Sequence, residues 1–330
     1  MHDVIVIGAG VAGLRCAGRL RDAGADVLIL DRADKVGGRC ATRFFDGQPF
    51  DYGPLFIHGD DPNFLASVRE TPGVHMLEGW PHRIEGKGTP CQPDAFAPSE
   101  TRLAFAEGLN AFPHHLAPGL SVKANTQVVS AAVAGEQVRV ESAIGEIFAA
   151  RDVVLAAALE QSIPFLRDDR TRALLDMFAS VPCLTVIAQY AHGTVEPDWD
   201  VCYPEDDDAL LLIGNDSAKR PHGDHVTLVC QAAARWSRAR FEAPRDEWSV
   251  ELLARAARRV GAWVASPERV HLHRWRYARL DKANELAGPV IVRSGKCRVG
   301  LAGDLFAPGG GMQAAWLSGD RLGAQLAHDA

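Results

Sequence analysis

Three glycines in one short turn are the first residues whose types and spacing suggest chemistry. Gly8, Gly10 and Gly13 follow the apolar residues 4–7 and precede a segment with helical spacing of its apolar residues. In such a turn the first glycine permits the bend, the second lets the backbone approach a pyrophosphate, and the third allows close helix–strand packing. The free N–H groups at the start of the helix attract phosphate charge. The pattern therefore predicts a dinucleotide site.

An acidic residue and a second glycine pair extend this pattern. Asp31 ends the next apolar segment, residues 26–31, at the spacing that suits hydrogen bonds to an adenosine ribose. Gly37, Gly38 and Arg39 then add backbone and side-chain groups suited to the same pyrophosphate. A domain that binds only NAD has no need of this addition. Glycines of an ordinary loop are the alternative, but the strand before, the helix after and the acid favour the nucleotide.

The C-terminal stretch is the second informative one. Gly303 and Asp304 end an apolar strand, glycines 309–311 form a loop, and a helix is expected from about Gln313 to residue 328. A strand, a Gly-Asp pair, a glycine loop and a helix N-terminus make a second site that favours an anion. Glycines that only cap the last helix are the structural alternative. Together with the N-terminal pattern, the stretch predicts two remote ends that bind one ligand.

Composition limits the class of protein. The chain has 330 residues, enough for two domains, and its 47% hydrophobic residues suffice for a full core. A net charge of −7 argues against non-specific nucleic-acid binding, and no apolar run of membrane-spanning length occurs. The N-terminus begins directly with a strand, so we expect no secretion and a cytoplasmic location. The seven scattered cysteines contain no CxxC pair, which is typical of reduced thiols.

The rest of the chain predicts the elements that position these motifs. Buried strands are expected at residues 152–157 and 297–304, together with the first two, a further strand at 144–149, and a hairpin or loop around Asp46 and Gly47. Strands at 126–130, 137–140, 183–190, 210–213, 226–232 and 270–278 and helices at 62–70, 103–116, 164–178 and 246–263 complete the pattern. His271 and His273 share one strand face and have metal-ligand character, but no Cys or carboxylate joins them, so no metal is predicted.

At this point the chain resembles the FAD-dependent amine-oxidase-like flavoproteins over most of its length, and within them the bacterial renalase branch. The N-terminal glycines, Asp31 and Gly37-Gly38-Arg39 resemble that family's FAD motif, and residues 303–319 resemble its C-terminal flavin motif. Residues 231–238 and 273–279 resemble the renalase branch. The resemblance implies an α/β fold, with a discontinuous Rossmann-like FAD-binding domain and an α+β substrate domain on a mostly antiparallel sheet. The expected division is 1–66, 99–163 and 272–330 for FAD, and 67–98 and 164–271 for substrate.

The resemblance also implies the residues that contact the cofactor. These are Gly8, Gly10, Val11, Ala12, Gly13, Asp31, Arg32, Gly38, Arg39, Tyr52, Gly53, Pro54, Leu55, Val128, Gly303, Asp304, Gly311, Met312, Gln313 and Ala314. A Gly-Pro pair beside aromatic residues at 52–56 suits a flat ligand, and a plain turn into a strand is the alternative. No general base is identified with certainty. His58, Trp275 and Tyr277 are pocket candidates, and Lys282 is a weaker one.

The implied reaction is hydride transfer from a small substrate to flavin N5, with electrons passed to O2 and H2O2 formed. The renalase branch implies isomeric dihydro-NAD(P) as substrate. Two departures bear on this. The branch's usual Gly-Ala-Gln-Tyr-Phe is Gly53-Pro54-Leu55-Phe56-Ile57 here, so its glutamine and tyrosine are missing, and Ala156-Ala157-Ala158-Leu159 replaces its Thr-Pro-Ala-Pro loop. An amine or amino-acid oxidase or desaturase on the same scaffold, a non-catalytic flavin-binding module, and an NAD-dependent dehydrogenase remain alternatives.

Overall fold

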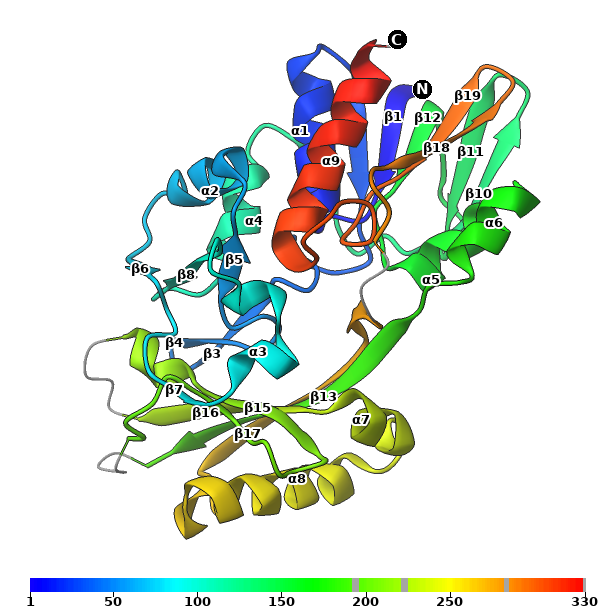
Figure 1. Ribbon diagram of the computed structural model, residues 1–330. Coiled ribbons are helices and arrows are strands. Elements are labelled where there is room, and N and C mark those ends of the chain that lie inside the picture. The colour runs from blue at the N-terminus through cyan, green and yellow to red at the C-terminus, as the bar shows by residue number, and fades with distance from the viewer. Residues whose placement is uncertain (192–195, 221–224, 282–284, 329–330) are drawn as a thin grey trace.

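The computed structural model describes residues 1–191, 196–220, 225–281 and 285–328, and Figure 1 shows two layered parts with shorter elements between them. The upper part contains a sheet with helices against it, and the lower part contains a second sheet with two helices beneath it. The fold is therefore α/β with a Rossmann-like part and a mostly antiparallel second sheet, as the sequence predicts.

The first sheet has eight strands within the described residues. They are β1 (His2–Ile7), β2 (Val27–Leu30), β9 (Ser121–Lys123), β10 (Val128–Ala134), β11 (Gln137–Ser142), β12 (Ile147–Leu155), β18 (Val290–Ser294) and β19 (Cys297–Leu301). Strands β19, β12, β1, β2 and β9 are paired in parallel. All four residues of β2 and the last four of β1 are buried, which explains their uninterrupted apolar sequence.

The two ends of the chain lie side by side against this sheet. Helices α1 (Val11–Asp22) and α9 (Gly311–His328), blue and red in Figure 1, are in contact along their lengths. A Cβ added at Gly319 would lie 2.2 Å from the Ala12 carbonyl oxygen, so the helices approach more closely than a side chain allows. Glycine at this position brings the C-terminal motif beside the N-terminal one.

The second sheet carries the lower part. Its strands are β7 (Ile84–Gly86), β13 (Ser180–Tyr190), β14 (Val201–Tyr203), β15 (Leu210–Asn215), β16 (Val226–Ala232) and β17 (Arg269–Leu280). Helices α7 (Ala234–Arg240) and α8 (Arg245–Val260) cover one face. Trp248 and Leu252 of α8 are buried in the same apolar cluster as Leu184 and Leu228, so burial of this helix face stabilises the layer.

Short elements connect the two sheets. The predicted hairpin is confirmed as β3 (Thr42–Phe45) and β4 (Gln48–Asp51), with positive φ at Asp46 and Gly47. A small sheet contains β5 (Ile57–Gly59), β6 (Met76–Glu78) and β8 (Thr101–Phe105). The short helices are α2 (Pro62–Arg69), α3 (Gly88–Cys91), α4 (Ala111–Leu116), α5 (Leu159–Ser162) and α6 (Asp169–Leu175), and 3-10 turns include η1 (Asp94–Phe96) and η3 (Asp216–Lys219).

Three segments differ from their predicted structure. Residues 103–105 belong to β8, because pairing with β5 and β6 overrides helical spacing, and only α4 is helical in 103–116. The helix predicted at 164–178 is confined to α6, and residues 144–157 contain one strand, β12, where two were predicted. The domain boundaries stay a prediction; β17 runs across the one at residue 272.

All seven cysteines are free thiols, and six of them are buried. Among the helices that the structure describes, none is long and apolar enough to cross a membrane.

The contact between α1 and α9 predicts that two glycine substitutions in these helices have different effects on stability. Gly319→Val forces the helices apart and is expected to lower the free energy of unfolding by about 1–3 kcal/mol. Gly18→Ala is the control, because no described atom lies within 4 Å of the added Cβ and alanine favours a helix by about 0.5–1 kcal/mol. Urea unfolding of both apoproteins measures the difference. Equal stability of the two variants would contradict this packing.

Candidate functional site

The two glycine motifs lie close together because the four parallel strands that precede or flank them end at the same edge of the sheet. Ile7 of β1 pairs with Leu30 of β2 and with Leu155 of β12, and Leu155 pairs with Leu301 of β19. The residues that follow these strands therefore leave the same edge of the sheet. Crevices at the carboxyl ends of parallel strands are where α/β proteins bind ligands. This register places the turn that begins at Gly8, Asp31 and the Gly303-Asp304 pair together.

The first glycine turn has the shape that a pyrophosphate requires. Gly8 has φ of +112°, and a Cβ at Gly13 would lie 2.0 Å from the Gly8 carbonyl oxygen. A Cβ at Gly10 would meet no described atom within 4 Å, so the space beside it is open to another molecule. Gly10 is also the N-cap of α1, which no described side chain caps and whose first turn carries no acid. Val11 and Ala12 therefore begin a helix N-terminus suited to an anion.

Asp31 lies against this turn. Its Oδ2 accepts a hydrogen bond from the Ala9 N–H at 2.5 Å, and its Oδ1 accepts one from the Ala33 N–H at 2.7 Å. The carboxylate is thus held at the edge of the turn, where a ribose hydroxyl could still donate to it. Arg32, the next residue, is exposed to solvent.

The second glycine pair packs on the first turn, and Arg39 joins it to the other end of the chain. The Gly37 N–H donates to the Ala9 carbonyl at 2.8 Å, and a Cβ at Gly38 would lie 3.4 Å from Gly10 Cα. Both terminal nitrogens of Arg39 lie 2.8 Å from the two carboxylate oxygens of Asp304. This bidentate ion pair links residues 265 positions apart.

The start of α9 is fixed by hydrogen bonds with neighbouring segments. Glycines 309–311 all have positive φ, and Glu285 accepts a hydrogen bond from the Gly309 N–H at 2.9 Å. Gln313 is buried, and its Oε1 accepts from the Asp60 and Asp61 N–H groups at 2.8 Å each. The sequence predicts cofactor contact for Gln313, and the structure places its side chain on backbone of the β5–α2 connection. Ala314 is buried and Met312 half-buried in the same core.

His58 lies beside this helix start with a carboxylate partner. Its Nδ1 is 2.9 Å from Glu100 Oε2, and its Nε2 would be 3.5 Å from a Cβ at Gly311. The two side chains are only 17% and 7% exposed. A carboxylate on Nδ1 holds the proton there and leaves Nε2 as the acceptor. Sequence analysis identified His58 but missed Glu100, because β5 and β8 were not predicted to pair.

Tyr52 and Trp275 form an aromatic wall. Their rings stack at 5.3 Å with an interplanar angle of 20°, and Trp275 Nε1 donates to the Tyr52 carbonyl at 2.9 Å. His271 and His273 of the same strand also contact Tyr52, with ring centroids 5.6 and 4.9 Å away. The described residues contain no cluster of three or more groups that could hold a metal ion. What the structure shows of these histidines is their ring contacts with the tyrosine.

The other predicted site residues are placed as follows. Leu55 is buried and Pro54 half-buried, and Gly53 approaches Arg39 so closely that a Cβ would lie 2.0 Å from the Arg39 carbonyl oxygen. Val128 begins β10, two residues after Thr126, whose N–H donates to the Asp31 carbonyl at 2.7 Å. Tyr277 is half-buried on β17. Lys282 lies outside the described residues.

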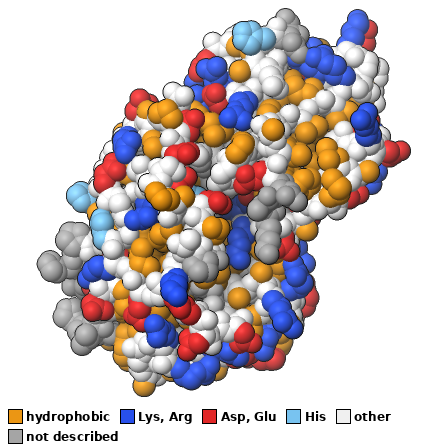
Figure 2. Space-filling model, in the orientation of Figure 1, with side chains coloured by type: hydrophobic (Ala, Val, Ile, Leu, Met, Phe, Trp, Pro, Cys, Tyr) orange, Lys and Arg blue, Asp and Glu red, His pale blue; other side chains and the backbone are white. Residues whose placement is uncertain are grey.

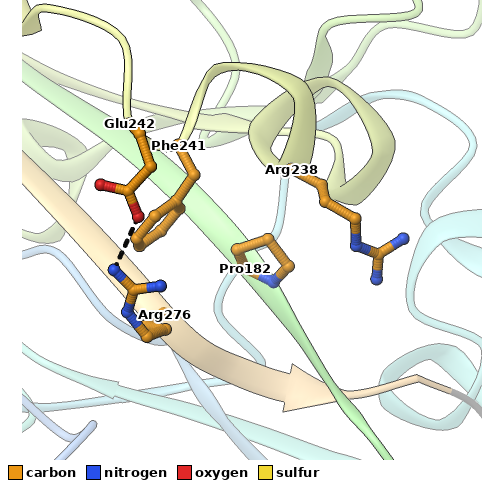
Figure 3. A pocket seen from close by; sticks show the side chains of 5 residues that line it. All are labelled: Pro182, Arg238, Phe241, Glu242 and Arg276. Carbon is orange, nitrogen blue, oxygen red and sulfur yellow. Dashed lines mark hydrogen bonds and ion pairs between the residues drawn. The ribbon is translucent and has the colours of Figure 1, made fainter.

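A pocket of about 300 Å³ lies on the opposite face of β17 from this wall. It is lined by Pro182, Arg238, Phe241, Glu242 and Arg276 (Figure 3). Arg276 donates to Glu242 at 2.8 Å, and neighbouring residues of a strand point to opposite faces, so this pocket does not adjoin Trp275. Figure 2 shows a separate depression between the two parts of the molecule, with Lys or Arg side chains inside it.

Comparison with known families agrees with this geometry. Residues 6–71 match the NAD(P)-binding Rossmann-like domain, and residues 87–326 match the flavin-containing amine oxidoreductases. The second match covers more than half of the chain. The chain belongs to the flavin-containing amine oxidoreductase family. Its cofactor is FAD, and the open space at Gly10, the uncapped start of α1 and the adjoining Asp31 fit that group.

Individual relatives are similar over shorter segments. Putrescine oxidase of Kocuria rosea is 36% identical over 107 residues, which are 32% of this chain and 22% of that protein. Probable polyamine oxidase 4 of Arabidopsis thaliana is 42% identical over 75 residues, 22% of this chain and 15% of that protein. The matched segments thus span about a fifth or less of these relatives. Cyclohexylamine oxidase from Brevibacterium oxydans IH-35A shares the fold, with a TM-score of 0.75, 16% identity and 99% of each chain covered.

Two glycines of the first turn predict separable effects on folding and on FAD binding. Gly10→Ala adds a Cβ in open space, so the apoprotein should keep its stability while the FAD dissociation constant rises about ten-fold, or about 1.4 kcal/mol. Gly13→Ala, the matched control, drives a Cβ onto backbone and should destabilise the apoprotein by about 1–3 kcal/mol. Apoprotein melting and FAD titration distinguish them. Unchanged FAD affinity in Gly10→Ala would remove this turn from the cofactor site.

The half-buried His273 predicts acid sensitivity. Burial, with the positive charges of His271, Arg43 and Arg245, lowers the pKa of His273 from its ordinary value of 6.5 to about 4. The unfolded chain therefore binds a proton before the folded protein does, and stability falls as pH drops from 6.5 towards 4. The stability of His273→Gln should fall less over this range, measured by urea unfolding. His114→Gln, at an exposed site, should lose as much stability as the wild type. If His273→Gln also lost as much as the wild type, His273 would not be the source of the acid sensitivity.

Proposed function

We propose that this chain is an FAD-dependent oxidase that acts on a small amine. When bound, FAD would supply the redox chemistry, a two-electron oxidation in which a hydride and a proton leave the substrate and O2 is reduced to H2O2. The observation that carries the proposal is the meeting of both glycine motifs at one sheet edge, bridged by Arg39 and Asp304. Family membership and the shared fold support it.

The chain's own residues then have distinct binding roles. The N–H groups at the start of α1 bind the pyrophosphate, and Asp31 accepts hydrogen bonds from the ribose. The N-terminus of α9 would present its positive end to the flavin and favour the negative charge of the reduced form. The segment 52–55 lies between Arg39 and the second sheet, and we assign it to the ring as well.

An amine substrate is supported by the His58–Glu100 pair. An amine carbon gives up a hydride readily only when its nitrogen is neutral, so one proton must first leave the ammonium group. His58 Nε2 is the acceptor that Glu100 orients, and the carboxylate stabilises the imidazolium that forms. The product is a protonated imine, because the ammonium form has lost one proton to His58 and one hydride from its carbon. The relatives named for putrescine and polyamines are in agreement.

A dihydronicotinamide is the second candidate. Its oxidation restores an aromatic ring and needs no base, and the stacked Tyr52 and Trp275 rings offer a flat surface to such a ring. The resemblance of residues 273–279 to the renalase branch favours the same substrate. Under this alternative, His58 and Glu100 would only bind and orient.

Anaerobic reduction of the bound flavin distinguishes the candidates. The holoprotein is mixed with monoamines, diamines and amino acids, and separately with isomeric dihydronicotinamides, while flavin absorbance is followed. We expect the amines to bleach the flavin. Bleaching by dihydronicotinamides alone would replace the amine proposal with the second candidate. A flavin that no donor reduces would indicate a binding module without catalysis.

The carboxylate partner of His58 gives a matched pair of variants. Glu100→Gln leaves an amide that cannot stabilise an imidazolium, so amine-driven flavin reduction should slow by about 100-fold. Glu78→Gln makes the same change in an exposed ion pair with Arg69 and should leave the rate unchanged. Stopped-flow reduction of both holoproteins measures the effect. Equal rates would show that Glu100 has no part in proton removal.

A further inference from the structure

A fully buried cluster of charges lies between β4 and the turn η3. The side chains of Asp51, Asp216 and Lys219 are all 0% exposed. Lys219 Nζ lies 2.7 Å from Asp51 Oδ2 and 2.8 Å from Asp216 Oδ1. Arg220 completes the cluster, since its Nη1 lies 2.8 Å from Asp216 Oδ2. Two carboxylates and two cations therefore balance one another.

The cluster joins segments that are remote in sequence. Asp51 Oδ1 accepts hydrogen bonds from the Leu109 N–H at 2.9 Å and from Thr42 Oγ1 at 2.5 Å. Lys219 Nζ also lies 4.9 Å from the centre of the Trp80 ring. Burial raises the pKa of Asp51 against the opposing effect of Lys219, whereas Lys219 and Arg220 outweigh burial and lower the pKa of Asp216.

Such a cluster is a costly way to stabilise a fold. Desolvation of buried charges offsets most of their attraction, and apolar side chains of similar volume often serve stability equally well. What paired charges add is a defined geometry, because each carboxylate must meet its particular donors. The end of β4 is thereby held against η3 of the second sheet.

The residues after Asp51 lie across that sheet. The Tyr52 carbonyl accepts from Trp275 of β17 at 2.9 Å, and the Gly53 carbonyl accepts from Gln231 of β16 at 2.6 Å. Leu55 packs on Gly214 of β15, where an added Cβ would come within 2.2 Å of its side chain. The segment 52–55 is therefore in contact with three strands of the second sheet and with the backbone of Arg39.

We propose that Lys219 is a positioning residue which, through Asp51 and Asp216, fixes the segment 52–55 between the FAD-binding turn at Arg39 and the second sheet. The cluster thereby sets the place of the flavin relative to the substrate-binding side. The inference rests on the proposed function only in assigning segment 52–55 to the flavin ring. It does not depend on which substrate is oxidised.

A charge-balanced double variant tests the proposal. Lys219→Met with Asp51→Asn removes one cation and one anion, and leaves Asp216 paired with Arg220. Arg298→Met with Asp152→Asn is the control, because it breaks another buried pair, 2.6 Å apart, between β19 and β12, three residues before the carboxyl ends of these strands. Hydrogen–deuterium exchange of the apoproteins, FAD titration and flavin reduction rates are compared once thermal melting shows that each variant is folded.

We expect amides 52, 53 and 55 to exchange about ten-fold faster in the Lys219 double variant, with weaker FAD binding. Reduction of the loaded protein should slow by about 10- to 100-fold, because small displacements cost this much. The control should keep wild-type values in all three. A folded Lys219 double variant with wild-type exchange and FAD affinity would overturn the proposal, whatever the substrate tests show.

If the double variant does not fold, hydrogen exchange of the wild-type apoprotein tests the proposal. Native-state exchange in mild denaturant should then show the amides of Tyr52 and Leu109 opening in one cooperative step, since Asp51 links them. Separate opening of these two amides would overturn the proposal.

Discussion

The ion pair between Arg39 and Asp304 is the constraint on which the candidate site depends. It joins two glycine-rich turns that are 265 residues apart, and it forms only because β1, β2, β12 and β19 end at one level. The close contact between helices α1 and α9 at Gly319 also holds the N-terminal and C-terminal motifs side by side. The strand register, the helix packing and the ion pair thus bring both motifs to one edge of the first sheet.

The second sheet is connected to this edge through its contacts with the segment 52–55. Trp275 and Gln231 reach the segment from β17 and β16, while Lys219 holds Asp51, the residue before it. The second sheet is therefore joined to the nucleotide-binding turns by polar contacts with demanding geometry. An enzyme that transfers a hydride between two bound partners needs such fixed placement, because small errors in position cost large factors in rate.

Local patterns predicted the parts whose chemistry lies in contiguous residues. The turn from Gly8 to Gly13, the acid Asp31 and the last helix could all be predicted, because spacing alone encodes them. Glu100 and Lys219 were not found, because the local sequence does not specify their pairing with His58 and Asp51, which lie 42 and 168 residues away. Residues 103–105 were mistaken for helix for the same reason: strand pairing, not local spacing, decides their structure.

FAD titration of the apoprotein, followed by its visible spectrum, tests the central claim most directly. If the two ends of the chain close around a single dinucleotide, the protein should bind one FAD per chain, and Arg39→Ala and Asp304→Ala should each weaken binding. Flavin bands should then appear at roughly 375 and 450 nm in the loaded protein. A folded apoprotein that binds NAD but not FAD, or binds FAD equally well without Arg39 and Asp304, would contradict the account.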